Sequence, residues 1–301
     1  MTERVLAVDI GGTKILAGLV AADGTTAASE QVATPAREGP AAIIAAVVGL
    51  CQRLQGEHGP VSRCGVGTAG VVGKHGEITS ATNHLTGWAG TMLQDRLAEA
   101  LDMPVTVLND VQAVGLCEAV LGAAKGHASA LVLALGTGVG GAIVRNGRVE
   151  RGAYGIAGSV GHHLSPVRRG RPCPCGGTDH LEAYASGTAM EAEYRARTGR
   201  SAGLRDIAAL ARSGDLVATA VIAEAADVLG AVIGSANNVI DADIVVVGGG
   251  VLALQDLLLP RARDAARREA LGLSKAVEIV PAEFGTTACL IGAALAAWQG
   301  D

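Results

Sequence analysis

Aromatic side chains are scarce in this 301-residue sequence, which contains two tryptophans, three tyrosines and one phenylalanine. Hydrophobic residues nevertheless make up 49% of the chain, so small and branched aliphatic side chains can build a sizeable core. Glycine is unusually frequent, with 43 occurrences. The length predicts two domains, at about 150 residues per domain.

Long apolar runs are also missing. A glycine or a charge interrupts every apolar stretch before it approaches the roughly 18 residues that a membrane span needs. We therefore expect no membrane span. The first residues lead directly into a strand, without the pattern of a signal peptide. The net charge is −5 and no basic face is evident, which argues against a nucleic-acid partner.

The cysteines do not suggest a disulfide framework. Four of the six cysteines stand alone in apolar sequence, namely Cys51, Cys64, Cys117 and Cys289. We expect these four to be buried as small hydrophobic side chains. Because nothing in the spacing suggests disulfides, a reducing cytoplasm is the expected location.

A glycine turn near the N-terminus is the first motif. Residues 6–19 join two apolar runs through Asp9-Ile10-Gly11-Gly12-Thr13-Lys14, which predicts a β-hairpin that ends at Asp23-Gly24. Backbone N–H groups in such a turn can approach an anion closely, and the lysine supplies a positive charge. Asp9, at the end of a buried strand, is a candidate to hold the water shell of a metal ion.

Residues 130–148 repeat this layout, with an apolar strand, a turn, a second apolar strand and Asn146-Gly147. The second turn contains Gly136, Thr137, Gly138, Gly140 and Gly141. The two hairpins predict a duplicated α/β domain whose turns face each other across a cleft and suit phosphate. Either turn alone could be an ordinary tight hairpin turn. Neither turn matches GxxxxGK[ST], the pattern of the Walker A phosphate-binding loop.

Other glycine-rich stretches are less specific. Gly248 to Gly250 follows a buried strand and could admit an adenine ring, or serve only to pack a helix. Helical patterns are expected at residues 40–55, 90–101, 111–121, 216–240 and 290–298. Residues 199–214 are the expected mobile surface stretch.

Asn109 and Asp110 stand where a predicted strand, residues 103–108, meets a helix N-terminus. Ligands often bind at such positions in α/β sheets. A carboxylate there could act as the general base for a hydroxyl, with the neighbouring amide fixing the substrate. The same pair would also suit an ordinary helix N-cap, so both interpretations stay open.

His162, His163, Cys173, Cys175 and His180 form a compact pattern of metal ligands. Two thiolates and two imidazoles suit a tetrahedral zinc ion, and four filled positions would make the site structural. The alternative is two surface cysteines near unrelated histidines. The basic residues Arg168, Arg169 and Arg171 within this segment are expected to be solvated.

These motifs together resemble the ROK sugar kinases, a family of the hexokinase–actin superfamily. The similar stretches run in order along the chain: DIGGTK at 9–14, GTGVGG at 136–141, VVVGGGV at 245–251 and ACLIGAALAA at 288–297. The most specific match is GSVGH at 158–162 with CPCGGTDHLEAYASG at 173–187. It is similar to the family signature GExGH followed by CxCGxxGCxExxxSG.

The resemblance implies an α/β fold of two actin-like ATPase (ribonuclease H-like) domains that flank a cleft. It implies a smaller domain, residues 1–108 plus 289–301, and a larger domain, residues 109–288, with a zinc loop at 162–180. It also implies a cytoplasmic homodimer or homotetramer that phosphorylates the 6-hydroxyl of a hexose or N-acylhexosamine with ATP. The implied cofactors besides ATP are magnesium and structural zinc.

Individual roles follow from the same resemblance. Asp110 is the implied catalytic base. The implied sugar contacts are Asn83, Asn109, Ser159, His162 and Glu182, and the implied zinc ligands are His162, Cys173, Cys175 and His180. Magnesium–ATP is expected at Asp9, Gly11, Gly12, Thr13, Lys14, Gly136, Thr137, Gly138 and Gly140, with adenosine at Gly248 and Gly249.

Three positions depart from the family pattern. His180 stands where the family usually has a third cysteine, and Asp179 stands where it has glycine. Ser159 replaces the glutamate of GExGH, which removes a charged acceptor near the sugar 2-position and leaves room there. Because the loop before Cys173 is longer than usual, His163 competes with His162 as a zinc ligand.

The leading interpretation is therefore an N-acetylmannosamine kinase, and the alternative is a glucokinase. A catalytically inactive sugar-binding or regulatory ROK protein is a remote alternative, since Asp9, Lys14, Asn109 and Asp110 are all present. A transcriptional repressor of the family would carry a helix-turn-helix domain before the first phosphate motif. That motif begins at residue 9 here, so this alternative is not expected.

Overall fold

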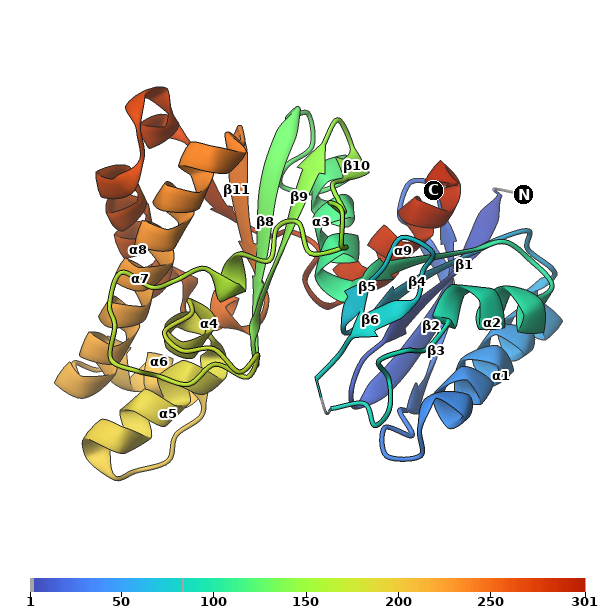
Figure 1. The fold of residues 1–301 in the computed structure, drawn as a ribbon, viewed down its shortest axis with the longest axis horizontal. Helices are drawn as coiled ribbons and strands as arrows, with labels where there is room; N and C mark the ends of the chain where they lie inside the picture. Colours follow the sequence, from blue (N-terminus) through green and yellow to red (C-terminus); the bar gives the residue numbers. More distant parts are fainter. Residues whose placement is uncertain (1–2, 83, 301) are drawn as a thin grey trace. The chain divides into compact units, whose positions relative to one another are not determined.

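The structure is a computed structural model that describes residues 3–82 and 84–300 (Figure 1). The chain divides into two compact units, each with α/β architecture. Unit 1 contains residues 1–125, 147–157 and 286–301, and unit 2 contains residues 126–146 and 158–285. The first segment of unit 1 therefore ends after residue 125, whereas the sequence predicted a boundary after residue 108.

The first hairpin forms as the sequence predicted. Strand β1 (Arg4–Ile10) pairs antiparallel with β2 (Lys14–Ala21). Asp23 and Gly24 then turn the chain into β3 (Thr26–Ala33), and Gly24 has a φ of +85° that an L side chain would rarely adopt. The Asp-Gly turn that was visible in the sequence thus ends β2 and leads into its antiparallel pairing with β3.

Two parallel strands complete the sheet of unit 1. β4 (Cys64–Thr68) pairs with β1, and β7 (Val105–Asn109) pairs with β4, which gives the order β3-β2-β1-β4-β7. Leu6, Val8 and Ile10 of β1 join an apolar cluster that α1 (Pro40–His58) shares. Because side chains alternate along a strand, Asp9 points to the opposite face of the sheet.

Helices α3 (Asp110–Val120) and α9 (Ala288–Gln299) pack closely on each other, and α9 also lies against β1 and β4. A Cβ on Gly292 would overlap the Ala113 carbonyl. Likewise, a Cβ on Gly65 would overlap the backbone of α9. This backbone-to-backbone packing is the reason that α3 belongs to unit 1. The shorter elements of unit 1 are β5 (Val71–Val72), β6 (Ile78–Ser80), α2 (Leu93–Leu101) and β10 (Arg148–Val149).

The second hairpin, in unit 2, repeats the strand pattern of the first. β8 (Ser129–Leu135) pairs antiparallel with β9 (Val139–Arg145) and parallel with β11 (Ile244–Gly248). In the same way, β1 pairs antiparallel with β2 and parallel with β4. β12 (Glu278–Pro281) continues the sheet beyond β11. The repeat that the sequence indicated is therefore present in the topology of the strands.

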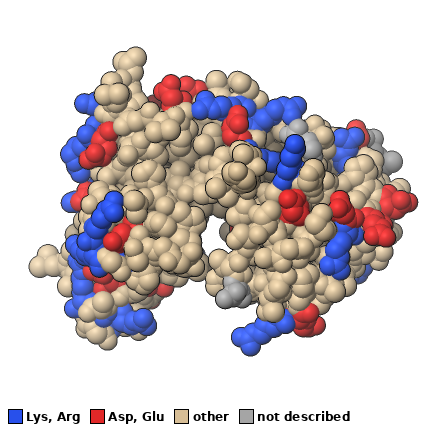
Figure 2. Space-filling model, in the orientation of Figure 1, with Lys and Arg blue, Asp and Glu red and all other residues tan. Residues whose placement is uncertain are grey.

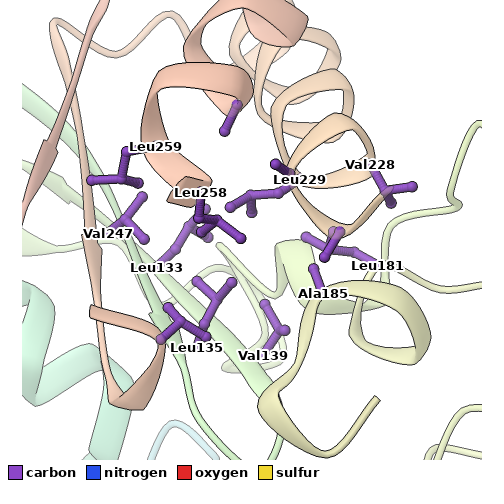
Figure 3. Close-up of a cluster of buried hydrophobic side chains, with 14 of the residues drawn as sticks. Leu133, Leu135, Val139, Leu181, Ala185, Val228, Leu229, Val247, Leu258 and Leu259 are labelled. Carbon is purple, nitrogen blue, oxygen red and sulfur yellow. The ribbon is translucent and has the colours of Figure 1, made fainter. Parts of the chain in front are cut away.

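The core of unit 2 is aliphatic, as the scarcity of aromatic residues requires. Figure 3 shows Leu133 of β8 and Val247 of β11 in this core, together with Leu258 of α8 (Gln255–Glu269). Helix α7 (Leu216–Ile240) packs along α8 and contributes many of its side chains to the same cluster. The remaining elements of unit 2 are η1 (Val160–His162), α4 (Glu182–Ala185), α5 (Gly187–Thr198), α6 (Leu204–Arg212), η2 (Gly250–Leu254) and η3 (Gly272–Ala276).

Helix α7 is long and apolar enough, by length and composition alone, to cross a membrane. Its most apolar window has a mean hydropathy of 2.0, and 56% of that window is buried inside the protein. The sequence predicted no span because Glu224 and Asp227 interrupt the apolar run. A buried core helix passes the same test, so this helix is weak evidence for a membrane span.

Residues 199–214, the expected mobile stretch, contain helix α6 (Leu204–Arg212). Ile207 and Ala208 are buried, and Leu204 and Ala211 pack against the same core. These apolar positions have the three- and four-residue spacing of an amphipathic helix. The segment is therefore a packed helix between glycine-containing ends.

Candidate active site

The first glycine turn exposes its central residues. The Gly11 N–H donates to the Lys14 carbonyl at 3.1 Å, and the Gly11 carbonyl accepts the Thr34 hydroxyl at 2.7 Å. Gly12, Thr13 and Lys14 are exposed. Thr34, which the sequence gave no reason to select, therefore fixes a turn whose central backbone is open to a ligand.

Asp9 lies one residue before the end of β1, close to this turn. Burial raises the pKa of Asp9 above the ordinary carboxyl value, because the charged form loses hydration. A hydrogen bond from the Cys289 thiol and the positive charge of Lys14 act in the opposite direction. Asp9 is thus a partly desolvated carboxylate beside an anion-sized turn.

Asn109 ends β7 and caps helix α3. Its Oδ1 accepts the backbone N–H groups of Val111 at 2.9 Å and Gln112 at 3.2 Å, and the Gln112 side chain accepts the Asn109 N–H in return. The Asn109 Nδ2 donates to Asp110 Oδ1 at 2.8 Å and to the Gly70 carbonyl at 2.9 Å. The N-cap interpretation is therefore correct for Asn109, and the cap itself orients Asp110.

Asp110 is the first residue of α3, and its environment shifts the pKa of its carboxyl group. Its pKa is raised to about 6, mainly because burial disfavours the carboxylate and also because the charge of Asp9 lies nearby. Hydrogen bonds from Val111 and Asn109 favour the carboxylate but do not offset the burial. A carboxyl group of this kind can exchange a proton near neutral pH.

The second glycine turn, in unit 2, is fixed from several sides. The Gly136 N–H donates to the Gly138 carbonyl at 2.8 Å, and the Gly136 carbonyl accepts the Gly187 N–H at 2.8 Å. The Thr137 carbonyl accepts the Thr188 hydroxyl at 2.6 Å. The helix N-terminus at residues 187–188 therefore holds this turn in shape.

Glu182 joins this turn to the Cys/His segment. Its Oε2 accepts the Val139 N–H at 2.7 Å, and a Cβ on Gly138 would overlap the carboxylate. Its Oε1 lies 3.8 Å from the Cys173 thiol. The resemblance implied separate places for Gly138 and Glu182, at phosphate and sugar respectively, and the structure brings the two residues together.

The Gly248–Gly250 turn lies at the same end of the sheet as the second glycine turn. In the parallel pair of β8 and β11, Gly248 is opposite Ala134, and Gly249 has a φ of +90°. A Cβ on Gly249 would overlap the Leu135 backbone. Gly249 thus allows the two strand ends to approach each other, and Gly250 adjoins open space.

The segment at residues 158–162 lies tightly on β9. A Cβ on Gly158 would overlap the backbone of Ala142, and one on Gly161 would overlap the Val139 carbonyl. Ser159 and His162 are exposed in this segment. Asn83, the remaining predicted sugar contact, lies outside the described residues.

Four predicted zinc ligands come together in unit 2. One donor atom from each of His162, Cys173, Cys175 and His180 lies within 4.8 Å of the others. Cys173 Sγ is 3.7 Å from His162 Nδ1, and Cys175 Sγ is 3.1 Å from His180 Nδ1. Tetrahedral zinc with bonds of about 2.0–2.3 Å separates its ligand atoms by about 3.3–3.8 Å. The Cys173–His162 separation lies in this range and the Cys175–His180 separation lies just below it, and two thiolates with two imidazoles are a donor set that suits zinc.

His163 is not a member of this group, and its Nδ1 lies 3.3 Å from the Leu164 carbonyl instead. The competition between the two histidines therefore favours His162. His180 takes the place of the third cysteine without leaving the cluster, because imidazole and thiolate can both serve as zinc ligands.

Asp179 has a structural role that the sequence did not reveal. It adopts a φ of +56°, and its carboxylate accepts the Tyr184 hydroxyl at 2.6 Å. It also accepts the backbone N–H groups of Arg169, Gly170 and Arg171. The Tyr184 hydrogen bond is the main cause that lowers the pKa of Asp179 to about 2. Asp179 thus holds the loop through its carboxylate as well as through its backbone.

The expectation of a solvated basic run is wrong for Arg171, whereas Arg169 remains exposed although it forms an ion pair. Both pair with Glu224, at 2.8 Å and 2.9 Å, and the Arg171 guanidinium stacks 4.3 Å from the centre of the Tyr184 ring. Figure 2 shows a similar interspersion of Lys and Arg with Asp and Glu on the face drawn. The two arginines therefore attach the Cys/His segment to Glu224 of α7.

Comparison with known proteins adds independent information. The family model described as the ROK family matches residues 5–299. A glucokinase of Streptomyces coelicolor is 31% identical over 315 residues, and the match covers 98% of each chain. An N-acetylmannosamine kinase of Escherichia coli O157:H7 is 33% identical over 306 residues, again with 98% of each chain covered.

Among solved structures, a ROK family glucokinase from Streptomyces griseus in complex with glucose and AMPPNP superposes with a TM-score of 0.83. It is 31% identical, and the match covers 98% of this chain and 99% of that one. The fold, the family match and the two kinds of relative agree with one another, whereas the relatives differ in the sugar that their names specify.

Proposed function

This chain belongs to the ROK family and is an ATP-dependent sugar kinase, and on that premise we propose that it phosphorylates N-acetylmannosamine at the 6-hydroxyl. The observation that carries the choice of sugar is Ser159, an exposed neutral residue three positions before His162. A glutamate there would present a charged acceptor to the sugar 2-position. A serine leaves space for an N-acetyl group and removes the charge.

Asp110 is the base in this proposal. Asn109 and Val111 both donate to Oδ1 of Asp110, so we assign Oδ2 to the sugar 6-hydroxyl. The hydroxyl proton moves to this oxygen as the hydroxyl oxygen attacks the terminal phosphorus of ATP. The bond from that phosphorus to the β–γ bridging oxygen breaks at the same time, and ADP leaves with the bonding electron pair. A pKa of about 6 keeps Asp110 largely ionised at neutral pH and still able to accept a proton. Asn109 acts by fixing the carboxylate, and its amide contacts a neighbouring sugar hydroxyl only if it exchanges the hydrogen bond to the Gly70 carbonyl.

The ATP phosphates are assigned to the two glycine turns. Gly11, Gly12 and Thr13 present backbone groups in an exposed turn, and Lys14 adds a positive charge. Gly136, Thr137, Gly138 and Gly140 supply the second turn, and Gly248 and Gly249 are assigned to adenosine. Bound magnesium would neutralise phosphate charge, and Asp9 would hold its water shell.

The zinc assignment rests on the chemistry of the donor set. His162, Cys173, Cys175 and His180 would hold zinc with all four positions filled, so the ion would stabilise the loop and take no part in proton transfer. Glu182 and His162 are assigned to sugar hydroxyls. Because Glu182 contacts both Cys173 and the second glycine turn, an ordered loop would keep its carboxylate in one orientation.

A glucokinase is the second candidate, and the glucokinase relatives support it. All six cysteines are free, which supports a cytoplasmic location for either activity. In both cases Asp110 and the glycine turns would have the same roles. The two candidates differ only in how residue 159 meets the sugar.

Side-by-side measurement of kcat/KM with N-acetylmannosamine, N-acetylglucosamine, mannose and glucose tests the proposal. We expect N-acetylmannosamine to be preferred. Ser159→Glu should shift the ratio toward glucose by about tenfold or more, because one hydrogen bond to a sugar hydroxyl is worth about 1–3 kcal/mol. Ser159→Ala is the matched control and should keep the wild-type preference. A wild-type preference for glucose would overturn the choice of sugar, and no turnover with any of the four would overturn the proposed acceptors.

A further inference from the structure

Cys289, the second residue of α9, contacts the strand pair that carries Asp9. Asp9 of β1 is directly opposite Gly67 of β4 in the parallel register. Residues opposite each other in a parallel pair direct their side chains to the same face. Gly67 has no side chain, and a Cβ there would overlap Cys289 Sγ. The sulfur therefore occupies the place beside Asp9 that a side chain of residue 67 would fill.

Donation from this thiol to the Asp9 carboxylate is also one of the causes that lower the pKa of Asp9. Cys289 is buried, and burial together with the negative charges of Asp9 and Asp110 raises its pKa well above the usual thiol value. A thiol in its ordinary protonated form can act only as a donor toward a carboxylate. A carboxylate that accepts from a neighbouring donor loses rotational freedom, which defines where its remaining lone pairs point.

We propose that Cys289 is a positioning residue, whose thiol holds the Asp9 carboxylate in the orientation that the magnesium–ATP site requires. This inference rests on the role proposed above for Asp9. A thiol suits the task because it is small enough to lie against Gly67 and donates only weakly. The carboxylate is therefore oriented without being neutralised. The sequence indicated only a buried small hydrophobic residue at position 289, and nothing local pointed to Asp9, 280 residues earlier.

Magnesium–ATP binding in the absence of sugar, measured by titration calorimetry, tests the inference apart from turnover. Cys289→Ala should weaken binding by about five- to tenfold, equivalent to about 1–1.4 kcal/mol, and should leave the affinity for sugar unchanged. Cys289→Ser keeps a donor and should recover binding to within about twofold of the wild type. Cys51→Ala is the matched control, since it removes a buried thiol of the same unit from the opposite face of the sheet.

A double-mutant cycle with Asp9→Asn separates positioning from general destabilisation. If Cys289 acts through Asp9, then adding Cys289→Ala to the Asp9→Asn variant should weaken magnesium–ATP binding by less than about a further twofold. Equal effects of Cys289→Ala and Cys51→Ala, or additive effects in the cycle, would overturn the inference. If Asp9→Asn itself binds magnesium–ATP normally, the proposed role of Asp9 fails instead. Thermal melts of each variant identify any that do not fold, and Cys289→Ser keeps the test valid in that case.

Discussion

At the scale of single residues, the acidity of Asp110 connects activity with stability. Its pKa of about 6 is raised because the carboxylate is poorly hydrated and lies near Asp9. We expect kcat/KM to fall as the pH drops through about 6, because the base becomes protonated. Asp110→Asn should abolish turnover at every pH and still bind sugar, as a calorimetric titration would show.

Substitution of Asp110 should also raise the free energy of unfolding. An aspartate whose pKa is raised in the folded state stabilises folding only below its unfolded pKa of about 4, and that contribution is lost as the pH rises through about 6. Asp110→Asn should therefore be more stable than the wild type at pH 7.5, by on the order of 1–3 kcal/mol, with the difference disappearing below about pH 4. Chemical denaturation at both pH values checks this expectation. Asp95→Asn, at an exposed position in the first turn of α2, is the control and should change the free energy of unfolding by less than about 1 kcal/mol at both pH values.

At the scale of elements, the Cys/His segment predicts which histidine holds a metal. Purified protein should contain one zinc ion per chain by mass spectrometry of the metal. His162→Ala and His180→Ala should lose it, because each removes a donor from the four-atom cluster. His163→Ala is the neighbouring control and should keep zinc. Loss of zinc from the His163 variant alone would contradict the assignment.

Two helical glycines predict opposite responses to the same substitution. A Cβ added to Gly49 of α1 would contact only the Arg53 side chain, at an ordinary van der Waals distance of 3.7 Å. Gly49→Ala should therefore stabilise the protein by about 0.5–1 kcal/mol through helix propensity. Gly292→Ala should instead destabilise it by about 1–3 kcal/mol, because the new methyl would overlap the Ala113 carbonyl. Equal shifts in the free energy of unfolding would contradict the close packing of α3 and α9.

Elements with strong local signals were predictable from the sequence, and elements that depend on distant partners were not. Asp23-Gly24 and the glycine turns predicted both hairpins, because those residues determine turn geometry locally. Helix α8 was not predicted, because Pro260 lies inside it and interrupts the usual helical pattern. The contact of Glu182 with Val139 joins residues 43 positions apart, which no periodicity reveals.

At the scale of the whole molecule, the repeated hairpins led to the correct α/β architecture, because each repeat is local and regular. The boundary between the units could not be predicted in the same way. Unit 1 takes three separate segments of the chain, and α3 belongs to it through Gly292 and Ala113, which are far apart in sequence. The candidate site was likewise predicted as a set of motifs, whereas Thr34, Asp179 and Cys289 emerged only from their contacts.

The return of the C-terminal helix to unit 1 has a consequence for the order of events on the ribosome. All residues of unit 2 have been synthesised when translation reaches residue 285, but α9 of unit 1 is still missing. At about 5–20 residues per second, the nascent chain must keep β1 and β4 without their covering helix until α9 has been synthesised. Unit 1 is therefore completed only after every residue of unit 2 has been synthesised.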